Sequence, residues 1–276
     1  MSLSPVAVVG AGTIGSGWRR VFEHAGLDVR VWDTDPARRT VDSLGEAVAG
    51  ARWVQESGPE HLATKQALFA ELDRLAPAEA IIASSTSALP MTEIAHGTSQ
   101  PERCIVAHPT NPPDIVPLVE IVPGERTAPE TTTSAVQFLE SVGQTPIACR
   151  KEIHGFVLNR LQMALLREAL HLHREGVASA ADIDRVVTEG LALRWAFLGP
   201  FAVEHTNADS LEEDLTKFGD VIGQLFAALT NDPRCPNADD VARLTTELDE
   251  IAGGRTHDEL IAYRDRMVQA LLALKG

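Results

Sequence analysis

The chain has few of the residues that build disulfide frameworks, zinc sites and aromatic ligand cages. Its 276 residues include one tyrosine and three scattered cysteines, Cys104, Cys149 and Cys235, with no Cys-x-x-Cys pair. An odd, scattered set of cysteines indicates neither a disulfide framework nor a zinc site, so we expect no bound metal. The pattern is typical of a protein in a reducing compartment.

Positive charge and long apolar runs are also scarce. Lysine and arginine number 24 against 39 aspartates and glutamates, a formal net charge of −15. Such an acidic chain is not expected to bind nucleic acid or an anionic membrane surface. No run reaches the roughly 18 apolar residues of a membrane span. Residues 1–5 lack the basic and apolar regions of a signal peptide. We therefore expect a cytoplasmic protein.

A glycine-rich turn stands at the start of the chain. Residues 6–9, Val-Ala-Val-Val, predict a buried strand, and Gly10, Gly12 and Gly15 follow in the spacing G-x-G-x-x-G. In a dinucleotide site Gly10 permits the tight turn, Gly12 lets the backbone approach a pyrophosphate, and Gly15 allows close packing of the next helix on the strand.

The helix predicted over 13–25 begins inside this turn. Its first N–H groups, those of Thr13 and Ile14, would face the phosphates, since the N-terminus of a helix attracts anions. A second strand is predicted at 29–32 and ends at Asp33. A carboxylate there accepts hydrogen bonds from the adenosine ribose and repels a 2′-phosphate, which favours NAD.

Two alternatives stay open around Asp33. Arg38 and Arg39 follow closely and keep NADP as a second candidate. Asp33 is also a residue type that caps helices, and Asp35-Pro36 behind it resembles a helix start.

Strands and helices alternate through residues 1–150. Strands are expected at 6–9, 29–32, 51–55, 80–84, 104–108 and 118–122, and helices at 13–25, 37–49, 61–75 and 131–142. This alternation predicts an α/β domain with a Rossmann-type, doubly wound parallel sheet.

Residues 151–276 have a different pattern. Helical periodicity recurs at 156–174, 181–189, 211–230, 239–251 and 258–275 without a clear strand. We expect an all-α C-terminal domain that serves substrate binding and dimerisation. Its helices carry more apolar positions than a small domain needs, and this surplus favours a homodimer.

Two polar residues stand at predicted strand ends. His108 ends one strand, and Glu120 lies twelve residues later inside another. Ligands of open α/β sheets bind at the carboxyl edge, where both side chains could meet. Imidazole is suited to take a hydroxyl proton, and a carboxylate on its other nitrogen fixes the tautomer. The alternative is an ordinary core histidine beside an exposed glutamate.

Six ordered motifs give the chain a resemblance to a known family. They lie at 10–15 (GAGTIG), 84–87 (SSTS), 105–113 (IVAHPTNPP), 117–121 (PLVEI), 155–160 (GFVLNR) and 194–200 (RWAFLGP). From Gly10 to about Asn207 the sequence resembles the 3-hydroxyacyl-CoA dehydrogenase superfamily. Within it, the sequence is most similar to the branch of lambda-crystallin (L-gulonate 3-dehydrogenase) and L-carnitine dehydrogenase.

The resemblance implies an NAD-dependent dehydrogenase with a His–Glu pair. It makes His108 the base and Glu120 its partner. By the same resemblance Ser87 hydrogen-bonds the substrate oxygen, Asn159 holds the substrate hydroxyl or carbonyl, and Asn111 reaches the nicotinamide. Without the resemblance, Ser87 is most simply the N-cap of a following helix.

Two charged residues are also assigned to the cofactor by the resemblance. Glu60 and Lys65 correspond to family residues near the nicotinamide ribose. The alternative for both is an ordinary charged first turn of a helix.

The chain departs from the family between Asp33 and Ser87, where the interval is shorter. The missing segment resembles a helical hairpin that contacts CoA, and its absence favours a small free hydroxy acid. Arg194 is the candidate for gripping the substrate carboxylate, because guanidinium offers a bidentate fork. Its alternative is a surface arginine packed on Trp195.

The preferred function is oxidation of a small L-3-hydroxy acid to a 3-oxo acid with NAD. The alternatives are a short-chain 3-hydroxyacyl-CoA dehydrogenase and a non-catalytic, crystallin-like NAD-binding protein.

Overall fold

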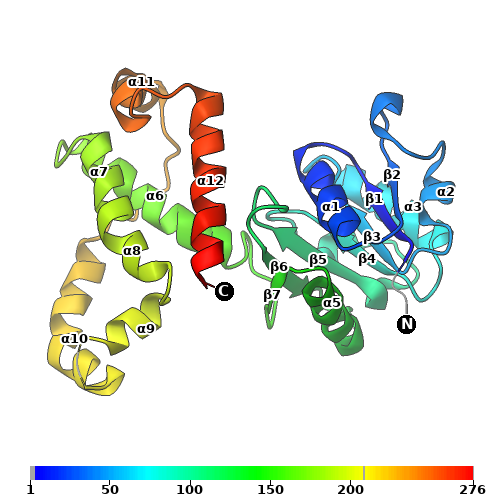
Figure 1. Ribbon diagram of the computed structural model, residues 1–276. Helices are drawn as coiled ribbons and strands as arrows, with labels where there is room; N and C mark the ends of the chain where they lie inside the picture. The colour runs from blue at the N-terminus through cyan, green and yellow to red at the C-terminus, as the bar shows by residue number, and fades with distance from the viewer. Residues whose placement is uncertain (1–3, 208, 276) are drawn as a thin grey trace. The chain divides into compact units, whose positions relative to one another are not determined.

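The computed structural model describes residues 4–207 and 209–275 (Figure 1). The chain divides into two compact units, Met1–Arg160 and Leu161–Gly276. This division lies after the boundary expected at 150, because the segment before Arg160 packs onto the first unit. Phe156, for example, belongs to that unit's hydrophobic core.

The first unit is built on a seven-stranded sheet. Its order is β2-β1-β3-β4-β5-β6-β7. The chain adds β2 on one side of β1 and then continues with β3 on the other side, so the order of the strands switches between β1 and β3. The strands are β1 (Val6–Val9), β2 (Val29–Trp32), β3 (Trp53–Glu56), β4 (Ile81–Ser84), β5 (Cys104–Pro109), β6 (Leu118–Pro123) and β7 (Thr145–Ala148). The carboxyl ends of β1 and β3 flank the point where a doubly wound sheet binds its ligand.

The sheet is mostly parallel, which confirms the expected Rossmann-type, doubly wound architecture, and one of its strand pairs is antiparallel. Strand β6 runs antiparallel to β5, and β7 pairs parallel with β6. Only the segment 110–117 joins β5 to β6, and it contains Pro112, Pro113 and Pro117. A parallel return needs a crossover of a dozen residues or more, so this short connection reverses the chain.

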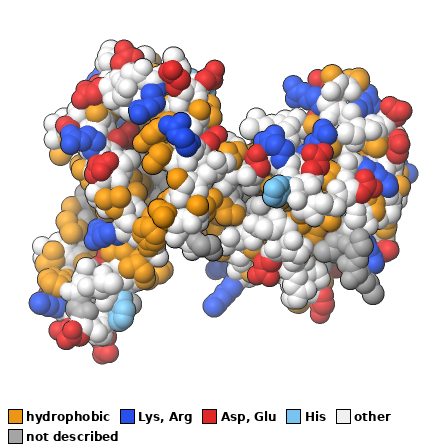
Figure 2. Space-filling view, viewed as in Figure 1, with side chains coloured by type: hydrophobic (Ala, Val, Ile, Leu, Met, Phe, Trp, Pro, Cys, Tyr) orange, Lys and Arg blue, Asp and Glu red, His pale blue; other side chains and the backbone are white. Residues whose placement is uncertain are grey.

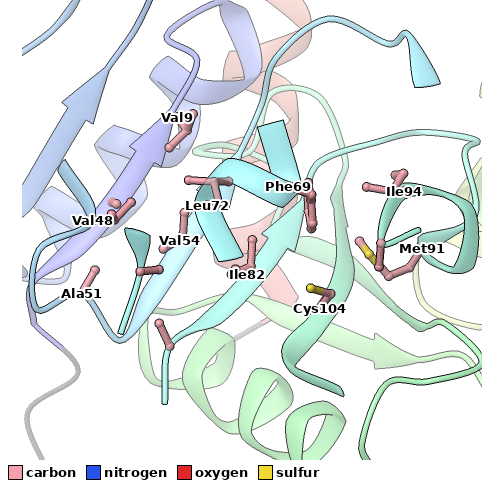
Figure 3. Packing of buried hydrophobic residues seen from close by; sticks show 14 of the residues in the cluster. Val9, Val48, Ala51, Val54, Phe69, Leu72, Ile82, Met91, Ile94 and Cys104 are labelled. Atoms are coloured by element: carbon pink, nitrogen blue, oxygen red, sulfur yellow. The ribbon is translucent and has the colours of Figure 1, made fainter. Parts of the chain in front are cut away.

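Helices cover both faces of the sheet. They are α1 (Thr13–His24), α2 (Leu44–Val48), α3 (Leu62–Leu75), α4 (Met91–Ile94) and α5 (Pro129–Ser141). Side chains of α2, α3 and α4 form one core cluster with the sheet, drawn in Figure 3 around Phe69 and Leu72. Side chains of α1 and α5 form the second cluster, in which Trp18, Phe22 and Phe138 pack together. The unit is therefore a three-layer α/β/α sandwich.

Two local expectations in this unit were wrong. The predicted helix over 37–49 is a short 3-10 turn, η1 (Pro36–Arg38), followed by a loop and then α2. The Thr40 N–H donates to the carbonyl oxygen of Val31, and the Val31 N–H donates to the Thr40 hydroxyl, so Thr40 is tied to β2 and not to a helix. Ser43 caps α2 by accepting from the N–H of Glu46. Strand β7 was not predicted, because Pro146 interrupts its pattern, which is tolerated on an edge strand.

The second unit is helical throughout its described residues. Its helices are α6 (Leu158–Arg174, which begins in the first unit), α7 (Ala180–Val186), a π-helical segment η3 (Val187–Leu191), α8 (Ala192–Trp195), α9 (Pro200–His205), α10 (Leu211–Ala228), α11 (Ala238–Ile251) and α12 (His257–Lys275). Helix α9 was not predicted. None of the described helices is long and apolar enough to cross a membrane.

Apolar side chains lie at the surface of this helical unit (Figure 2). Among its described residues, the buried apolar side chains are small: Ala180, Ala181, Val203 and Ala252. Many of the large ones, such as Phe201 and Phe226, are exposed.

Candidate functional site

Four polar residues form a row at the carboxyl edge of β3, β4 and β5 and the adjoining start of β6. Successive side chains of a strand alternate between the faces of a sheet, so residues two apart share a face. Each of these polar residues lies two positions from an apolar residue of the core cluster that contains α3. Those apolar neighbours are Val54, Ile82, Val106 and Val122. The row therefore lies on that face and consists of Glu56, Ser84, His108 and Glu120.

His108 and Glu120 are direct neighbours in the antiparallel pair β5–β6. The His108 Nδ1 atom lies 2.7 Å from Glu120 Oε2. Glu120 is fully buried and His108 is 7% exposed. The proximity expected from the sequence is thus confirmed, and its cause is the chain reversal between the two strands.

The second oxygen of Glu120 holds the start of α6. Glu120 Oε1 accepts hydrogen bonds from the N–H groups of Val157 and Leu158, at 2.8 and 2.9 Å. Burial raises the pKa of Glu120, but the bonds from His108 and the two N–H groups outweigh it, and the pKa lies below its ordinary value. Glu120 is therefore a carboxylate that orients the histidine ring.

A left-handed turn precedes these two N–H groups. Gly155 has φ +75° and Phe156 has φ +48°, a conformation that costs energy for a residue with a Cβ. Phe156 is 1% exposed, and its ring centroid lies 5.6 Å from that of His108. The turn thus aims the start of α6 at Glu120 and covers the histidine ring.

Ser87 and Asn159 lie together beside this pair. The Asn159 side-chain amide donates to the carbonyl oxygen of Ser87 at 2.9 Å, although 72 residues separate them. The capping alternative for Ser87 was wrong, because α4 begins after Pro90. The first unit therefore brings Ser87 and Asn159 together as the family resemblance implies.

The glycine-rich turn has the geometry that a dinucleotide needs. A Cβ on Gly10 would lie 2.7 Å from the carbonyl oxygen of Ser57, and one on Gly15 would lie 1.8 Å from that of Gly10. A Cβ on Gly12 would meet nothing within 4 Å. Helix α1 has no side-chain cap, so the N–H groups of Thr13 and Ile14 face outward from its N-terminus. Open space beside uncapped N–H groups fits a pyrophosphate.

Asp33 lies beside the glycine-rich turn. Its Oδ2 accepts from the N–H of Ala11 at 2.6 Å and its Oδ1 from that of Asp35 at 2.8 Å. Burial raises the pKa of Asp33, but these bonds outweigh it and lower the pKa below its ordinary value. The capping alternative was wrong, since Asp35 caps the turn η1 by accepting from Ala37.

A cavity of about 300 Å³ lies beside the start of α1. It is lined by Ala11, Gly15, Ser16, Arg19, Val31, Ala37 and Arg38. The guanidinium of Arg38 is 3.3 Å from the Asp35 carboxylate, so part of its charge is already balanced. Together with the ionised Asp33, this leaves an environment that fits NAD.

The remaining predicted residues have different surroundings. Lys65 is buried against Glu56, and Glu60 contacts the segment that carries Ser87. Asn111 is exposed in the bend after β5, directly before the cis-bonded Pro112. Arg194 is exposed on α8 in the second unit.

Sequence reasoning missed Glu56 and Phe156 as site residues. Glu56 is a fully buried charge at the end of β3, and a charged residue that ends an apolar strand is a detectable signal. Phe156 gave no such signal, because its positive φ does not show in the sequence.

Comparison with known proteins identifies the family. The model of the 3-hydroxyacyl-CoA dehydrogenase NAD-binding domain matches residues 5–43 and 37–153, and that of the C-terminal domain matches 155–221. The chain belongs to the 3-hydroxyacyl-CoA dehydrogenase family. It is accordingly an NAD-dependent dehydrogenase that acts on a CH–OH group.

Individual relatives cover most of the chain. An L-carnitine dehydrogenase of Streptomyces coelicolor is 39% identical over 305 residues, covering 98% of this chain and 94% of its own. A lambda-crystallin homolog of Bos taurus is 39% identical over 249 residues, 78% of each chain. The crystal structure of the NAD⁺-dependent dismutase 5-formyl-3-hydroxy-2-methylpyridine 4-carboxylic acid 5-dehydrogenase superposes with a TM-score of 0.84 at 30% identity, covering 100% of this chain and 98% of that one.

The comparison also supports a shortened cofactor domain. Since 98% of 276 residues is about 270, about 35 positions of the 305-residue alignment with the Streptomyces enzyme have no counterpart here. The family model matches in two pieces that overlap at 37–43, which covers the end of η1 and the loop before α2. The match is therefore interrupted in the interval between Asp33 and Ser87, where the sequence is shorter than expected for the family.

Proposed function

We propose that the protein oxidises the 3-hydroxyl of a small, free L-3-hydroxy acid to a 3-oxo acid with NAD. The observation that carries this proposal is the buried His108–Glu120 hydrogen bond at the carboxyl edge of the sheet, in the same unit as the uncapped start of α1. Hydride transfer from an alcohol needs at least a general base and a dinucleotide-binding site held in fixed positions within one domain.

The hydrogen bond determines which nitrogen acts as the base. The Glu120 carboxylate only accepts, so the proton between the pair belongs to His108 Nδ1. In neutral imidazole Nε2 is then unprotonated and takes the substrate hydroxyl proton. Glu120 stabilises the imidazolium that forms, while bound NAD supplies the hydride acceptor.

Ser87 and Asn159 are the proposed contacts to the substrate oxygen. Their mutual hydrogen bond occupies one Asn159 N–H and leaves the other N–H and the amide oxygen for a ligand. In the same proposal Asn111 lies on the nicotinamide side. Arg194 remains the candidate ligand of the substrate carboxylate, which Arg194→Lys tests: it is expected to raise KM for a free acid, because lysine cannot form the bidentate fork.

Two observations favour a free acid over a CoA ester. The loop after Asp33 is shortened where the family carries additional residues. Two of the relatives above are named for free acids, L-carnitine and a pyridine carboxylic acid. Less surface is therefore available in this unit to bind the CoA moiety of an ester substrate.

The test is NADH formation with a substrate panel of L-carnitine, L-gulonate, L-3-hydroxybutyrate and L-3-hydroxybutyryl-CoA. We expect turnover of a free acid and a loss of about 10²- to 10⁴-fold in kcat/KM for His108→Ala. His96→Ala is the matched control, since His96 is exposed in the same unit. Turnover of the CoA ester alone would refute the free-acid assignment, and NADH binding without turnover would favour the crystallin-like alternative.

We also propose that the protein is a cytoplasmic homodimer that associates through its helical unit. Among the residues that the structure describes, 26 large hydrophobic side chains are exposed, and all but three of them lie in residues 161–276. A monomeric domain rarely exposes so much apolar surface, whereas a homodimer interface is apolar at its core. Sedimentation equilibrium of the purified protein measures the mass directly, and a monomer at micromolar concentration would contradict the proposal.

A further inference from the structure

A buried ion pair lies under the loop that carries Ser87. The Lys65 ammonium is 2.9 Å from both carboxylate oxygens of Glu56. Lys65 is 1% exposed and Glu56 is fully buried. Lysine is rarely buried, because removing its charge from water costs several kcal/mol unless a partner compensates. Lys65 is therefore not simply a solvent-exposed charge in the first turn of a helix, and its burial needs another explanation.

Glu56 holds the beginning of the loop. Its Oε2 accepts from the Ser84 hydroxyl at 2.6 Å, and its Oε1 accepts from the N–H of Gly58, also at 2.6 Å. Ser84 is the register partner of Glu56 on the adjacent strand. The pair therefore fixes the end of β4, three residues before Ser87.

Glu60 holds the other end of the same loop. Its Oε1 accepts from the Thr86 hydroxyl at 2.7 Å and from the N–H groups of Ser87 and Ala88 at 2.8 and 3.2 Å. The Ser87 hydroxyl also donates to it at 3.2 Å. The other carboxylate oxygen, Oε2, lies 3.6 Å from the Lys65 ammonium. One lysine thus joins the two carboxylates that hold segment 84–88.

The three N–H bonds of Lys65 are all used within the protein. Two point to Glu56, and the third points to the carbonyl oxygen of Gly58 at 3.3 Å. An ammonium group has three donors, so none remains for a ribose hydroxyl. The hydrogen-bond inventory therefore disfavours direct contact between Lys65 and the cofactor.

We infer that Lys65 is a positioning residue that acts through Glu56 and Glu60 to hold Ser87 beside the place of the substrate oxygen, whose proton goes to His108 Nε2. The Glu60 carboxylate can only accept, so it fixes both the N–H and the hydroxyl of Ser87. Burial raises the pKa of Glu60, but the hydrogen bonds from Thr86 and Ser87 and the nearby charge of Lys65 outweigh it, and the pKa lies below its ordinary value. The role at the substrate rests on the proposed function; the holding of the loop does not.

The decisive variant is the double substitution Glu56→Gln with Lys65→Met. Lys65→Met alone strands a buried carboxylate and is expected to unfold the protein. The double variant removes both charges, keeps similar side-chain volumes and leaves an amide oxygen for Ser84. The matched control is Arg52→Met with Glu79→Gln, an exposed pair 3.5 Å apart in the same unit.

Three measurements are made on the full-length protein. Backbone amide exchange at residues 87 and 88 is expected to accelerate about tenfold, the equivalent of about one charge-assisted hydrogen bond. The Kd for NADH, from fluorescence, is expected to stay within about twofold. With an active substrate from the panel, kcat is expected to fall about tenfold while KM for NAD is unchanged.

The outcomes separate this inference from the proposed function. Amide exchange and NADH affinity are measured without turnover, so they decide the role of Lys65 even if every substrate in the panel is inactive. Faster exchange with unchanged NADH affinity supports the inference. Unchanged exchange at 87 and 88, or a loss of NADH affinity of about tenfold or more, overturns it in favour of direct cofactor contact.

Discussion

The two units of this chain use the same kind of apolar residue in opposite ways. In the first unit, side chains such as Trp18, Phe69 and Ile82 are fully buried between the sheet and its helices. In the second unit, Phe201 is 81% exposed and Phe226 is 70% exposed. The first unit completes its own core, whereas the helical unit exposes many of its large apolar side chains.

This difference parallels the distribution of the proposed site residues between the units. The His108–Glu120 pair, Ser87, Asn159 and the glycine-rich turn all belong to residues 1–160. A catalytic pair needs a frame that holds it to a fraction of an ångström, and a close-packed sheet core provides one. The helical unit contributes surface, and its stability is expected to depend on protein concentration.

The largest contrast is expected from removing one phenylalanine in each unit. Phe69→Ala creates a cavity under the sheet and is expected to lower the free energy of unfolding by about 3–5 kcal/mol. Phe201→Ala, in the exposed surface, is expected to change it by less than about 0.5 kcal/mol in dilute protein. Urea unfolding followed by tryptophan fluorescence measures both. Equal losses in the two variants would refute the contrast.

The fold of the first unit was largely predictable because its signals are local. The fingerprint at 10–15, the strand at 6–9 and Asp33 fall in one continuous stretch, and their geometry follows from the sequence. The proximity of His108 and Glu120 was predictable from strand-end placement. The antiparallel register that produces it was not, since direction depends on how a proline-rich connection folds.

The rest of the site could not be predicted from local patterns. The positive φ of Phe156 accompanies the packing of its ring beside His108, and the bonds of Lys65 depend on residues far apart in the sequence. The Asn159–Ser87 contact spans 72 residues and was assigned by family resemblance alone. Tertiary constraints of this kind leave no periodicity in a single sequence.

A charge placed in the exposed apolar surface is expected to have the next largest effect. Phe226→Glu on α10 is expected to weaken the proposed homodimer by about 100-fold or more, since a carboxylate would have to be buried at the proposed interface. Sedimentation equilibrium measures the dissociation constant. Gln224→Glu, an exposed polar position on the same helix, is the control and is expected to change it little. An unchanged mass for Phe226→Glu would place the interface elsewhere.

Two glycines with the same backbone strain provide a finer comparison. Gly155 has φ +75° and Gly176 has φ +67°, and an added Cβ meets only open space or ordinary contacts at both. Alanine at either position is expected to cost about 1–2 kcal/mol of stability. Only Gly155→Ala is expected to lower kcat as well, because its turn aims the N–H groups of Val157 and Leu158 at Glu120. An equal loss of kcat in Gly176→Ala would contradict a specific role of the Gly155 turn in catalysis.

The smallest expected effect concerns acid stability of the helical unit. Arg174 on α6 bonds Asp240 at 2.8 Å and Asp232 at 3.3 Å. Hydrogen bonds from Arg234 lower the pKa of Asp232 to about 2, and the bond from Arg174 lowers the pKa of Asp240 below its ordinary value. A carboxyl with a lowered folded-state pKa stabilises the protein fully above its unfolded value of 3.8. That stabilisation is lost as the pH falls from there toward about 2.

Arg174→Met removes the shared cation, so the helical unit is expected to lose its structure at a higher pH than in the parent protein. The first unit, whose lowered carboxyl pKa values have other causes, is expected to keep its acid midpoint. Far-ultraviolet circular dichroism follows the helices, and the fluorescence of the buried Trp18 and Trp53 follows the first unit. Arg264→Met, which removes a pair with the adjacent Asp265, serves as the control. A shift of both signals together would show that the two units unfold as one. The two units would then differ in the exposure of their apolar side chains and not in their acid stability.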